Sequence, residues 1–207
     1  MADEVIFYHN PRSRAQMAHW MLEEVAAPYR IVPIDFEKAE HTAPAILAIN
    51  PMGKLPTIIH RGVVVTETAA IIAYLADAFP GAGLAPAIDD PARGAYYRWL
   101  FFGAGCIEPA LIDTMLKRPP VEAKAALGWG SYEDVVGTLK KALSAGPYLL
   151  GDRFTAADVY VGSELNWAMM FDAPGLKGEA VIDDYIARLT ARPAYRRVAP
   201  APQTGAG

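Results

Sequence analysis

Three polar side chains lie close together near the start of the chain, where a short apolar run gives way to a helical pattern. Tyr8 ends the run VIFY, Asn10 follows it, and Ser13 stands where the helical spacing begins. A hydroxyl donor beside the free N–H groups of a helix start favours an anion. Ser13 would also serve as an N-cap, and Tyr8 would also pack on a core at the end of a strand. The residues alone leave both interpretations open.

A second group of candidate residues lies at two later turns of the chain. Leu55 and Pro56 follow Lys54 and lead into the apolar run TIIH, while Glu67 and Thr68 precede the run AAIIAYLADAF. The amides of a helix start bind carboxylates, and an acid–hydroxyl pair there adds an acceptor and a donor. Each of these residues also has an ordinary structural interpretation. Pro56 would be a trans proline that opens a strand, Lys54 a solvated surface lysine, and Thr68 a helix cap.

The run YYRWLFFGAGCIEPAL is an apolar and aromatic stretch of the second half of the chain. Phe101 and Glu108 within it could line a pocket for an apolar molecule, although such a stripe is more often core. If Glu108 is buried, it must be paired or protonated. Pro109 is expected to kink this helix, which would also allow Glu108 to face solvent. Cys106 is expected to be a small buried hydrophobe.

Composition and charge exclude several function classes. The 207-residue chain has a formal net charge of -4 and no basic stripe, which argues against nucleic-acid binding. Its four histidines form no ligand-like cluster and it has no Gly-rich phosphate loop, so neither a metal nor a phosphate site is expected. One cysteine excludes an internal disulfide and favours a reducing compartment. No signal peptide and no apolar run of about 18 residues are visible, so we expect a cytoplasmic protein without a membrane partner.

Periodicity predicts two halves of different character. The predicted strands cover 5–8, 30–35, 56–60 and 63–66, and the predicted helices of the first half cover 14–25, 44–50 and 67–79. This order implies a small mixed sheet with helices on its faces over residues 1–80. After a turn-rich linker at 81–88, residues 89–198 show only helical patterns, in which Ser131 and the pair Thr155 and Asp158 are expected caps. The Pro-, Ala- and Gly-rich residues 199–207 are expected to form a flexible tail.

Four stretches together resemble the glutathione transferase superfamily, of the bacterial, cytosolic type. In chain order they are FYHNPRSRAQMAHWMLEE, NPMGKLPTI, VVTETAAIIAYLADAFP and PYLLGDRFTAADVYV. Each is modest alone, but their order and spacing cover nearly the whole chain. The resemblance implies an α/β thioredoxin-like N-terminal domain that binds glutathione. It also implies an all-α C-terminal helical-bundle domain that supplies most of the second-substrate pocket.

The resemblance further implies the roles of the first group of residues. Glutathione would be the co-substrate, with no other cofactor. Its thiol would be activated by Ser13, Tyr8 or Asn10, because branches of the family differ in this donor. Serine is the expected activator where the first helix begins with a Ser-Arg run, which makes Ser13 our first choice.

The second group of residues would hold the glutathione backbone. By resemblance, Pro56 is in cis, and Leu55 pairs its backbone with the cysteinyl part of glutathione like an added strand. Lys54 would pair with the glycine carboxylate. Glu67 and Thr68 would hold the γ-glutamyl end.

The resemblance also implies a homodimer that conjugates glutathione to a small hydrophobic electrophile, with Phe101 and Glu108 in the pocket. Peroxidase, isomerase and dehalogenase reactions use the same thiolate, and a non-catalytic ligand-binding protein can use the same fold. A glutaredoxin-like disulfide reductase would need a cysteine at the first helix, where this chain has Pro11, Arg12 and Ser13.

Overall fold

The computed structural model describes residues 3–119 and 121–199. Its strands are β1 (Val5–His9), β2 (Tyr29–Pro33), β3 (Thr57–His60) and β4 (Val63–Thr66). They form one sheet in the order β2-β1-β3-β4, in which β1 is parallel to β2 and antiparallel to β3, and β3 and β4 form the predicted hairpin. Pro33 is tolerated in β2 because an edge strand can spare an N–H donor.

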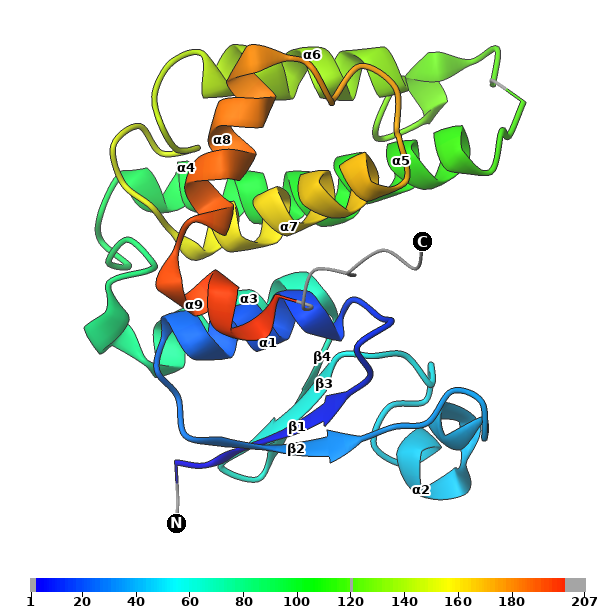
Figure 1. Cartoon of the computed structure of the whole chain (residues 1–207), viewed down its shortest axis with the longest axis vertical. Helices are drawn as coiled ribbons and strands as arrows, with labels where there is room; N and C mark the ends of the chain where they lie inside the picture. Colours follow the sequence, from blue (N-terminus) through cyan, green and yellow to red (C-terminus); the bar gives the residue numbers. More distant parts are fainter. Residues whose placement is uncertain (1–2, 120, 200–207) are drawn as a thin grey trace, which may run out of the picture.

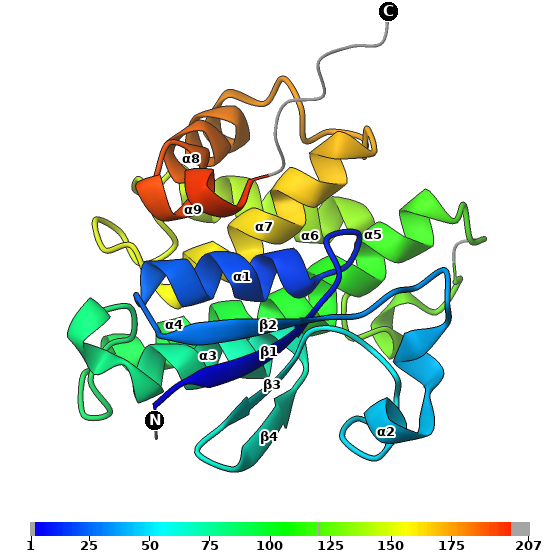
Figure 2. The ribbon, with the colours of Figure 1, turned by 60° about the horizontal axis from the view of Figure 1, so that its bottom comes forward.

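Two helices lie between the sheet and the helical half of the molecule (Figure 1). They are α1 (Ala15–Glu24), which connects the parallel strands, and α3 (Thr68–Ala78). The short α2 (Pro44–Leu47) follows the turn η1 (Glu40–Thr42) and stands apart from α1 and α3 in Figure 2, and η2 (Pro80–Ala82) follows α3. The sheet and its helices match the predicted order of elements.

The helical half surrounds one central helix, α7, which is buried along most of its length. Its elements are α4 (Ala92–Phe102), η3 (Gly103–Ile107), α5 (Glu108–Met115), η4 (Lys124–Ala126), α6 (Tyr132–Leu143), α7 (Ala156–Met170), α8 (Ala180–Thr190) and α9 (Pro193–Val198). Within 3–119 and 121–199 no strand follows β4, although two isolated bridges tie the turn at 148–153. The expected fold class, an α/β half followed by an all-α half, is confirmed.

The long helix expected around Pro109 is interrupted one turn earlier than the sequence suggested. Residues Gly103–Ile107 form a π-helical turn, and Pro109 lies in the first turn of α5. A proline has no N–H for the carbonyl four residues before it, so the backbone must rearrange at Gly105. Widened turns of this kind are one of the few recognised causes of a break in a helix.

The expected caps of the helical half are present. The Ser131 hydroxyl accepts from the Asp134 N–H at 3.2 Å, and Thr155 and Asp158 form a capping box. Asp158 is fully buried, and its carboxylate also accepts from the N–H of Leu149 and the hydroxyl of Tyr185. One carboxylate therefore fixes the start of α7, the preceding turn and α8.

Ion pairs tie the two halves together at two places. Arg93 is buried and donates to Asp77 at the end of α3 and to the carbonyl of Pro86 in the segment between α3 and α4. Toward the other end of the chain, Arg192 makes a two-pronged ion pair with Glu24 of α1, whose side chain is only 6% exposed. Of the expected tail, residues 200–207 lie outside the described residues.

Candidate active site

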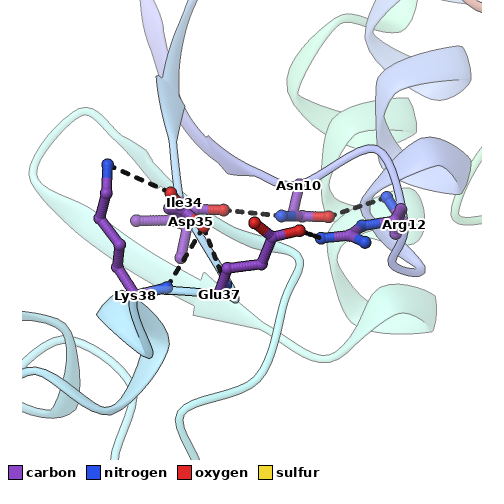
Figure 3. Close-up of polar contacts among 6 residues, drawn as sticks. All are labelled: Asn10, Arg12, Ile34, Asp35, Glu37 and Lys38. Carbon is purple, nitrogen blue, oxygen red and sulfur yellow. Dashed lines mark hydrogen bonds and ion pairs between the residues drawn. The ribbon is translucent and has the colours of Figure 1, made fainter.

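Asn10 fixes the loop between β1 and α1. Its side-chain amide donates to the carbonyl of Ile34 at 2.7 Å, and its Oδ1 accepts from the N–H of Arg12 at 2.8 Å (Figure 3). Arg12 also reaches across to Glu37, so the loops after β1 and β2 are joined. Asn10 is buried, with both ends of its amide engaged. This arrangement gives Asn10 a structural task in the loop.

Ser13 stands immediately before the N-cap residue Arg14 of α1. Its hydroxyl donates to the carbonyl of Asn10 at 2.7 Å and accepts from the N–H of Ala15 at 3.1 Å. It therefore satisfies one free amide of the helix start, as a cap does. Ser13 is also only partly buried and lines a cavity of about 510 Å³. The structure thus combines the cap position with access to the cavity.

Strand register brings the other predicted residues together at one end of the sheet. Tyr8 of β1 lies opposite Thr57, and Thr57 lies opposite Thr66 at the end of β4. Leu55–Pro56 immediately precede Thr57, and Glu67 immediately follows Thr66. Tyr8, the proline loop and the start of α3 are therefore neighbours.

The Leu55–Pro56 peptide bond is cis, which confirms the prediction. Asn50, a residue that the sequence analysis missed, supports the loop: its side-chain amide donates to the carbonyl of Lys54 at 2.9 Å and to the Thr57 hydroxyl at 3.2 Å. Asn50 is buried, while the Lys54 side chain is exposed. The loop is thus held through its backbone, and the lysine is left facing solvent.

Glu67 has an unusual backbone conformation. It is the N-cap of α3 with φ 63° and ψ 121°, outside the regions that residues with a side chain prefer, and its side chain is exposed. Such conformations cost roughly 1–3 kcal/mol and gather at functional sites. The following Thr68 is buried at the first turn of the helix. The turn therefore places a solvent-exposed carboxylate and free helix amides next to Thr66, which pairs with Thr57 directly after the cis-proline.

His41 is a further residue that the sequence did not single out. It packs edge-on against Phe36, with ring centroids 4.9 Å apart, and its Nδ1 is buried without a hydrogen-bond partner among the described residues. A Cβ atom at Gly53 would lie 2.9 Å from the His41 carbonyl, so only glycine allows this close approach. His41 is thereby held beside the loop that carries Lys54.

A cavity of about 510 Å³ lies between α1 and the helical half. Its wall includes Ser13, Arg14, Met17, Trp20, Ser163, Asn166, Trp167, Met170, Phe171, Tyr195 and Val198. Most of this wall is aromatic or aliphatic. Cavities of this size and character take small apolar molecules with a few polar contacts.

The two residues expected in the second-substrate pocket are placed differently. Glu108 does not line the cavity itself, but it makes an ion pair of 2.5 Å with Arg14, which does. Phe101 is 74% exposed on α4 and does not line this cavity. The aromatic side chains of the cavity wall include Trp167 and Phe171 instead. The sequence did not reveal this, because an apolar stripe does not show which face of a helix packs against a neighbour.

Comparisons with known proteins agree with this arrangement. The models of the N-terminal and C-terminal domains of glutathione S-transferase match residues 3–77 and 130–193. The chain belongs to the glutathione S-transferase superfamily. It is 26% identical over 188 residues to glutathione S-transferase GstA of Escherichia coli O157:H7, covering 90% of this chain and 92% of that one.

Solved structures of the superfamily share the fold. A glutathione transferase family member from Pseudomonas fluorescens pf-5, with two glutathione bound, has a TM-score of 0.80 and 25% identity over 96% of this chain and 93% of that one. Over a shorter stretch, the chain is 40% identical to maleylacetoacetate isomerase of Rhizobium meliloti, across 88 residues that cover 42% of this chain and 41% of the relative.

This glutathione S-transferase family member carries an ionisable group behind the cavity. Glu164 of α7 is buried, and its two carboxyl oxygens have no hydrogen-bond partner among the described residues. Burial, followed by the charge of Glu108, raises the pKa of Glu164 to about 8. Glu164 is therefore mainly protonated at neutral pH.

Other features of the family member carry less chemistry. Cys106 is partly buried against the core, rather than fully buried as expected, and burial raises the pKa of its thiol. Residues 3–119 and 121–199 include no helix that is long and apolar enough to cross a membrane. Across the same ranges, no three His, Cys, Asp or Glu side chains are grouped so that they could hold a metal ion.

Proposed function

We propose that this protein is a glutathione transferase that conjugates the thiolate of glutathione to a small hydrophobic electrophile. The observation that carries the proposal is the position of Ser13. Its hydroxyl lies at the start of α1, on the wall of an apolar cavity, in the loop that follows β1. A thiolate bound there would meet a hydroxyl donor and the positive end of a helix.

Glutathione would occupy the end of the sheet where Tyr8, Leu55–Pro56 and Glu67 meet. The backbone of Leu55 would pair with the cysteinyl residue, as an added strand does. Glu67 would accept from the α-ammonium group, and the amides at the start of α3 would donate to the α-carboxylate. The exposed Lys54 and the neighbouring His41 are cationic or donor groups suited to the glycine carboxylate.

The site would first ionise the thiol of glutathione, and the thiolate would then attack the electrophile. A free thiol has a pKa of about 8.5, and lowering it by two units takes roughly 2.7 kcal/mol of preferential thiolate stabilisation. To donate to the sulfur, the Ser13 hydroxyl would turn away from the Asn10 carbonyl that it now contacts. The thiolate sulfur then forms a bond to the electrophilic atom, and the leaving group departs with the bonding electrons or, in an addition, a proton is taken up.

The lining of the cavity indicates the second substrate. Trp167 and Phe171 offer flat apolar surfaces, and the guanidinium of Arg14 lies 5.6 Å from the Trp167 ring centroid. An aromatic electrophile that gains negative charge on attack fits this wall, because Arg14 supplies a cation beside the Trp167 ring. A cytoplasmic setting suits the reaction, since glutathione and other thiols stay reduced in the cytosol.

Thiolate titration is the test of the proposal. The thiolate absorbance of bound glutathione is followed against pH in the wild type and in the Ser13→Ala and Tyr8→Phe variants. We expect a lowered thiol pKa in the wild type and in Tyr8→Phe, and a value close to that of free glutathione in Ser13→Ala. If the wild-type complex titrates like free glutathione, the protein binds glutathione without activating it.

Isomerisation is the second candidate. It is favoured by the similarity of 88 residues to a protein named maleylacetoacetate isomerase. The same thiolate would add to a cis double bond and leave again after rotation, with no net consumption of glutathione. Turnover of maleylacetoacetate without loss of glutathione would select this reaction over conjugation.

A homodimer is the proposed assembly. Val63 and Val64 on the edge strand β4 are exposed, as are Tyr97 and Phe101 on α4. Exposed apolar side chains on these two elements suit a contact with a second copy. Sedimentation at micromolar concentration is expected to give twice the chain mass of 22.4 kDa, and a stable monomer would refute the assembly.

A further inference from the structure

Glu164 lies at a place where two helices approach unusually closely. A Cβ atom on Gly103 would lie 2.6 Å from the Tyr160 ring and 3.1 Å from Oε2 of Glu164, so only glycine fits there. Gly103 opens the π-helical turn η3, which packs against α7 at this point. The carboxyl group is therefore enclosed by helix backbone and an aromatic ring, and no hydrogen bond within the described residues satisfies it.

The titratable groups that act on Glu164 come from three elements. Glu108 begins α5 directly after η3, Arg14 precedes α1, and Tyr160 lies one turn earlier on α7. Burial and the charge of Glu108 raise the pKa of Glu164, whereas Tyr160 and Arg14 oppose the rise. Two carboxyl groups thus act on one guanidinium, and near neutrality one of the two holds a proton.

Arg14 connects this buried carboxyl to the site. Its guanidinium contacts Glu108 at 2.5 Å, lies over the Trp167 ring, and forms part of the cavity wall next to Ser13. While Glu164 is neutral, Glu108 is the anion that holds Arg14. Once Glu164 ionises, it repels Glu108 and attracts Arg14 toward the interior.

We propose that Glu164 is a positioning residue: its protonated form keeps the Arg14–Glu108 pair on the cavity wall, and loss of its proton draws Arg14 away. The proposal rests on the proposed function in so far as this cavity takes the electrophile. It predicts that the electrophile is used less well in alkaline solution, although free glutathione becomes more reactive there.

The first test is a pH profile. The ratio kcat/KM for 1-chloro-2,4-dinitrobenzene, at saturating glutathione, is measured from pH 6.5 to 9.5 for the wild type, Glu164→Gln and the exposed control Glu122→Gln. A group with a pKa near 8 is about one-tenth protonated at pH 9. Between pH 6.5 and 9, kcat/KM of the wild type should therefore fall about tenfold relative to kcat/KM of Glu164→Gln. The Glu122→Gln control should follow the wild type. Superimposable profiles of the wild type and Glu164→Gln would overturn the proposal.

A second variant protects the test against misfolding of Glu164→Gln. Because the charge of Glu108 raises the pKa of Glu164, Glu108→Gln should move the alkaline loss of kcat/KM to lower pH. A midpoint that does not move would contradict the coupling between the two carboxyl groups.

A binding measurement separates this proposal from the proposed function. The fluorescent aromatic anion 8-anilinonaphthalene-1-sulfonate is titrated into the wild type and Glu164→Gln at pH 6.5 and 9. A fall in affinity at pH 9 in the wild type alone supports the positioning role even if no conjugation occurs at any pH. Conjugation by the wild type together with pH-independent binding by both proteins would leave the proposed function standing and overturn the role of Glu164.

Discussion

The two sides of the candidate site are built in different ways. On the sheet side, turns and strand register bring Leu55–Pro56 and Glu67 together, and the backbone supplies much of the recognition. On the helical side, Ser13, which precedes α1, and Trp167 of α7 line the same cavity although more than half the chain separates them in sequence. A backbone-built surface tolerates many sequences, whereas a side-chain wall changes with every substitution. A superfamily can therefore keep one thiol donor and vary what it reacts with.

The largest effect is expected where the helical side depends on one carboxylate. In Asp158→Ala, donors from Leu149, Thr155 and Tyr185 lose their buried acceptor. Unsatisfied buried donors cost about 1–3 kcal/mol each, and partial relaxation should leave a loss of about 4 kcal/mol in the free energy of unfolding. Urea unfolding measures the loss, with Ser131→Ala, which removes the solvent-exposed cap of α6, as a control that should cost about 1 kcal/mol. Equal losses would show that Asp158 does not hold the helical side together.

The next effect concerns the residue where the two sides meet. Loss of one donor to a negative charge commonly lowers turnover roughly 10²–10³-fold, so Ser13→Ala should lower kcat by that factor while glutathione affinity stays nearly intact. Tyr8→Phe is the matched control, since it also removes one hydroxyl, and it should do little. Steady-state kinetics with glutathione and the electrophile measure kcat and KM of both variants and so show which hydroxyl activates the thiol. The reverse pattern would assign activation to Tyr8.

Glu164 gives the helical side a stability that depends on pH. Its pKa is higher in the folded chain than in the unfolded chain, so the native state keeps a proton that the unfolded state releases. Between about pH 5 and 8, the wild type should therefore lose stability relative to Glu164→Gln, by up to about 1.4 kcal/mol per pH unit. Urea unfolding of both proteins at pH 5.5, 6.5 and 7.5 measures the difference. Parallel stability curves would contradict it.

The smallest effect is expected on the sheet side. Glu67→Ala should weaken glutathione binding roughly tenfold, because a charge-assisted hydrogen bond at a solvent-facing turn is lost while the backbone contacts remain. Calorimetric titration with glutathione gives the affinity, and Glu122→Ala is the exposed control. Equal affinities of the two variants would remove Glu67 from the site. A loss far above tenfold would mean that side chains dominate on this side too.

The sequence predicted the sheet side better than the helical side, for a physical reason. The residues Leu55, Pro56, Glu67 and Thr68 belong to short motifs whose order identifies the turns. Helix contacts leave a weaker trace, because any apolar stripe can face core, pocket or partner. Phe101 shows this, since composition suggested a pocket residue and the side chain is largely exposed.

Some missed residues had a readable signal and others did not. Glu164 follows Tyr160 by four positions and precedes Ala168 by four, both of them buried, so helical spacing places it on the buried stripe of α7. The π-helical turn had a signal in Pro109, although its exact position did not follow from it. His41 had no signal, because its position depends on the close approach of Gly53 to its backbone.

The ion pair between Glu24 and Arg192 has a consequence for the making of the protein. The two residues are 168 positions apart, and α9, which Arg192 precedes, packs against α1. At the roughly 5–20 residues per second of protein synthesis, about 10–30 seconds separate the appearance of the two partners. During this interval the apolar face of α1 that includes Trp20 lacks part of its cover. Helix α1 therefore completes this part of its packing only after α9 has been synthesised.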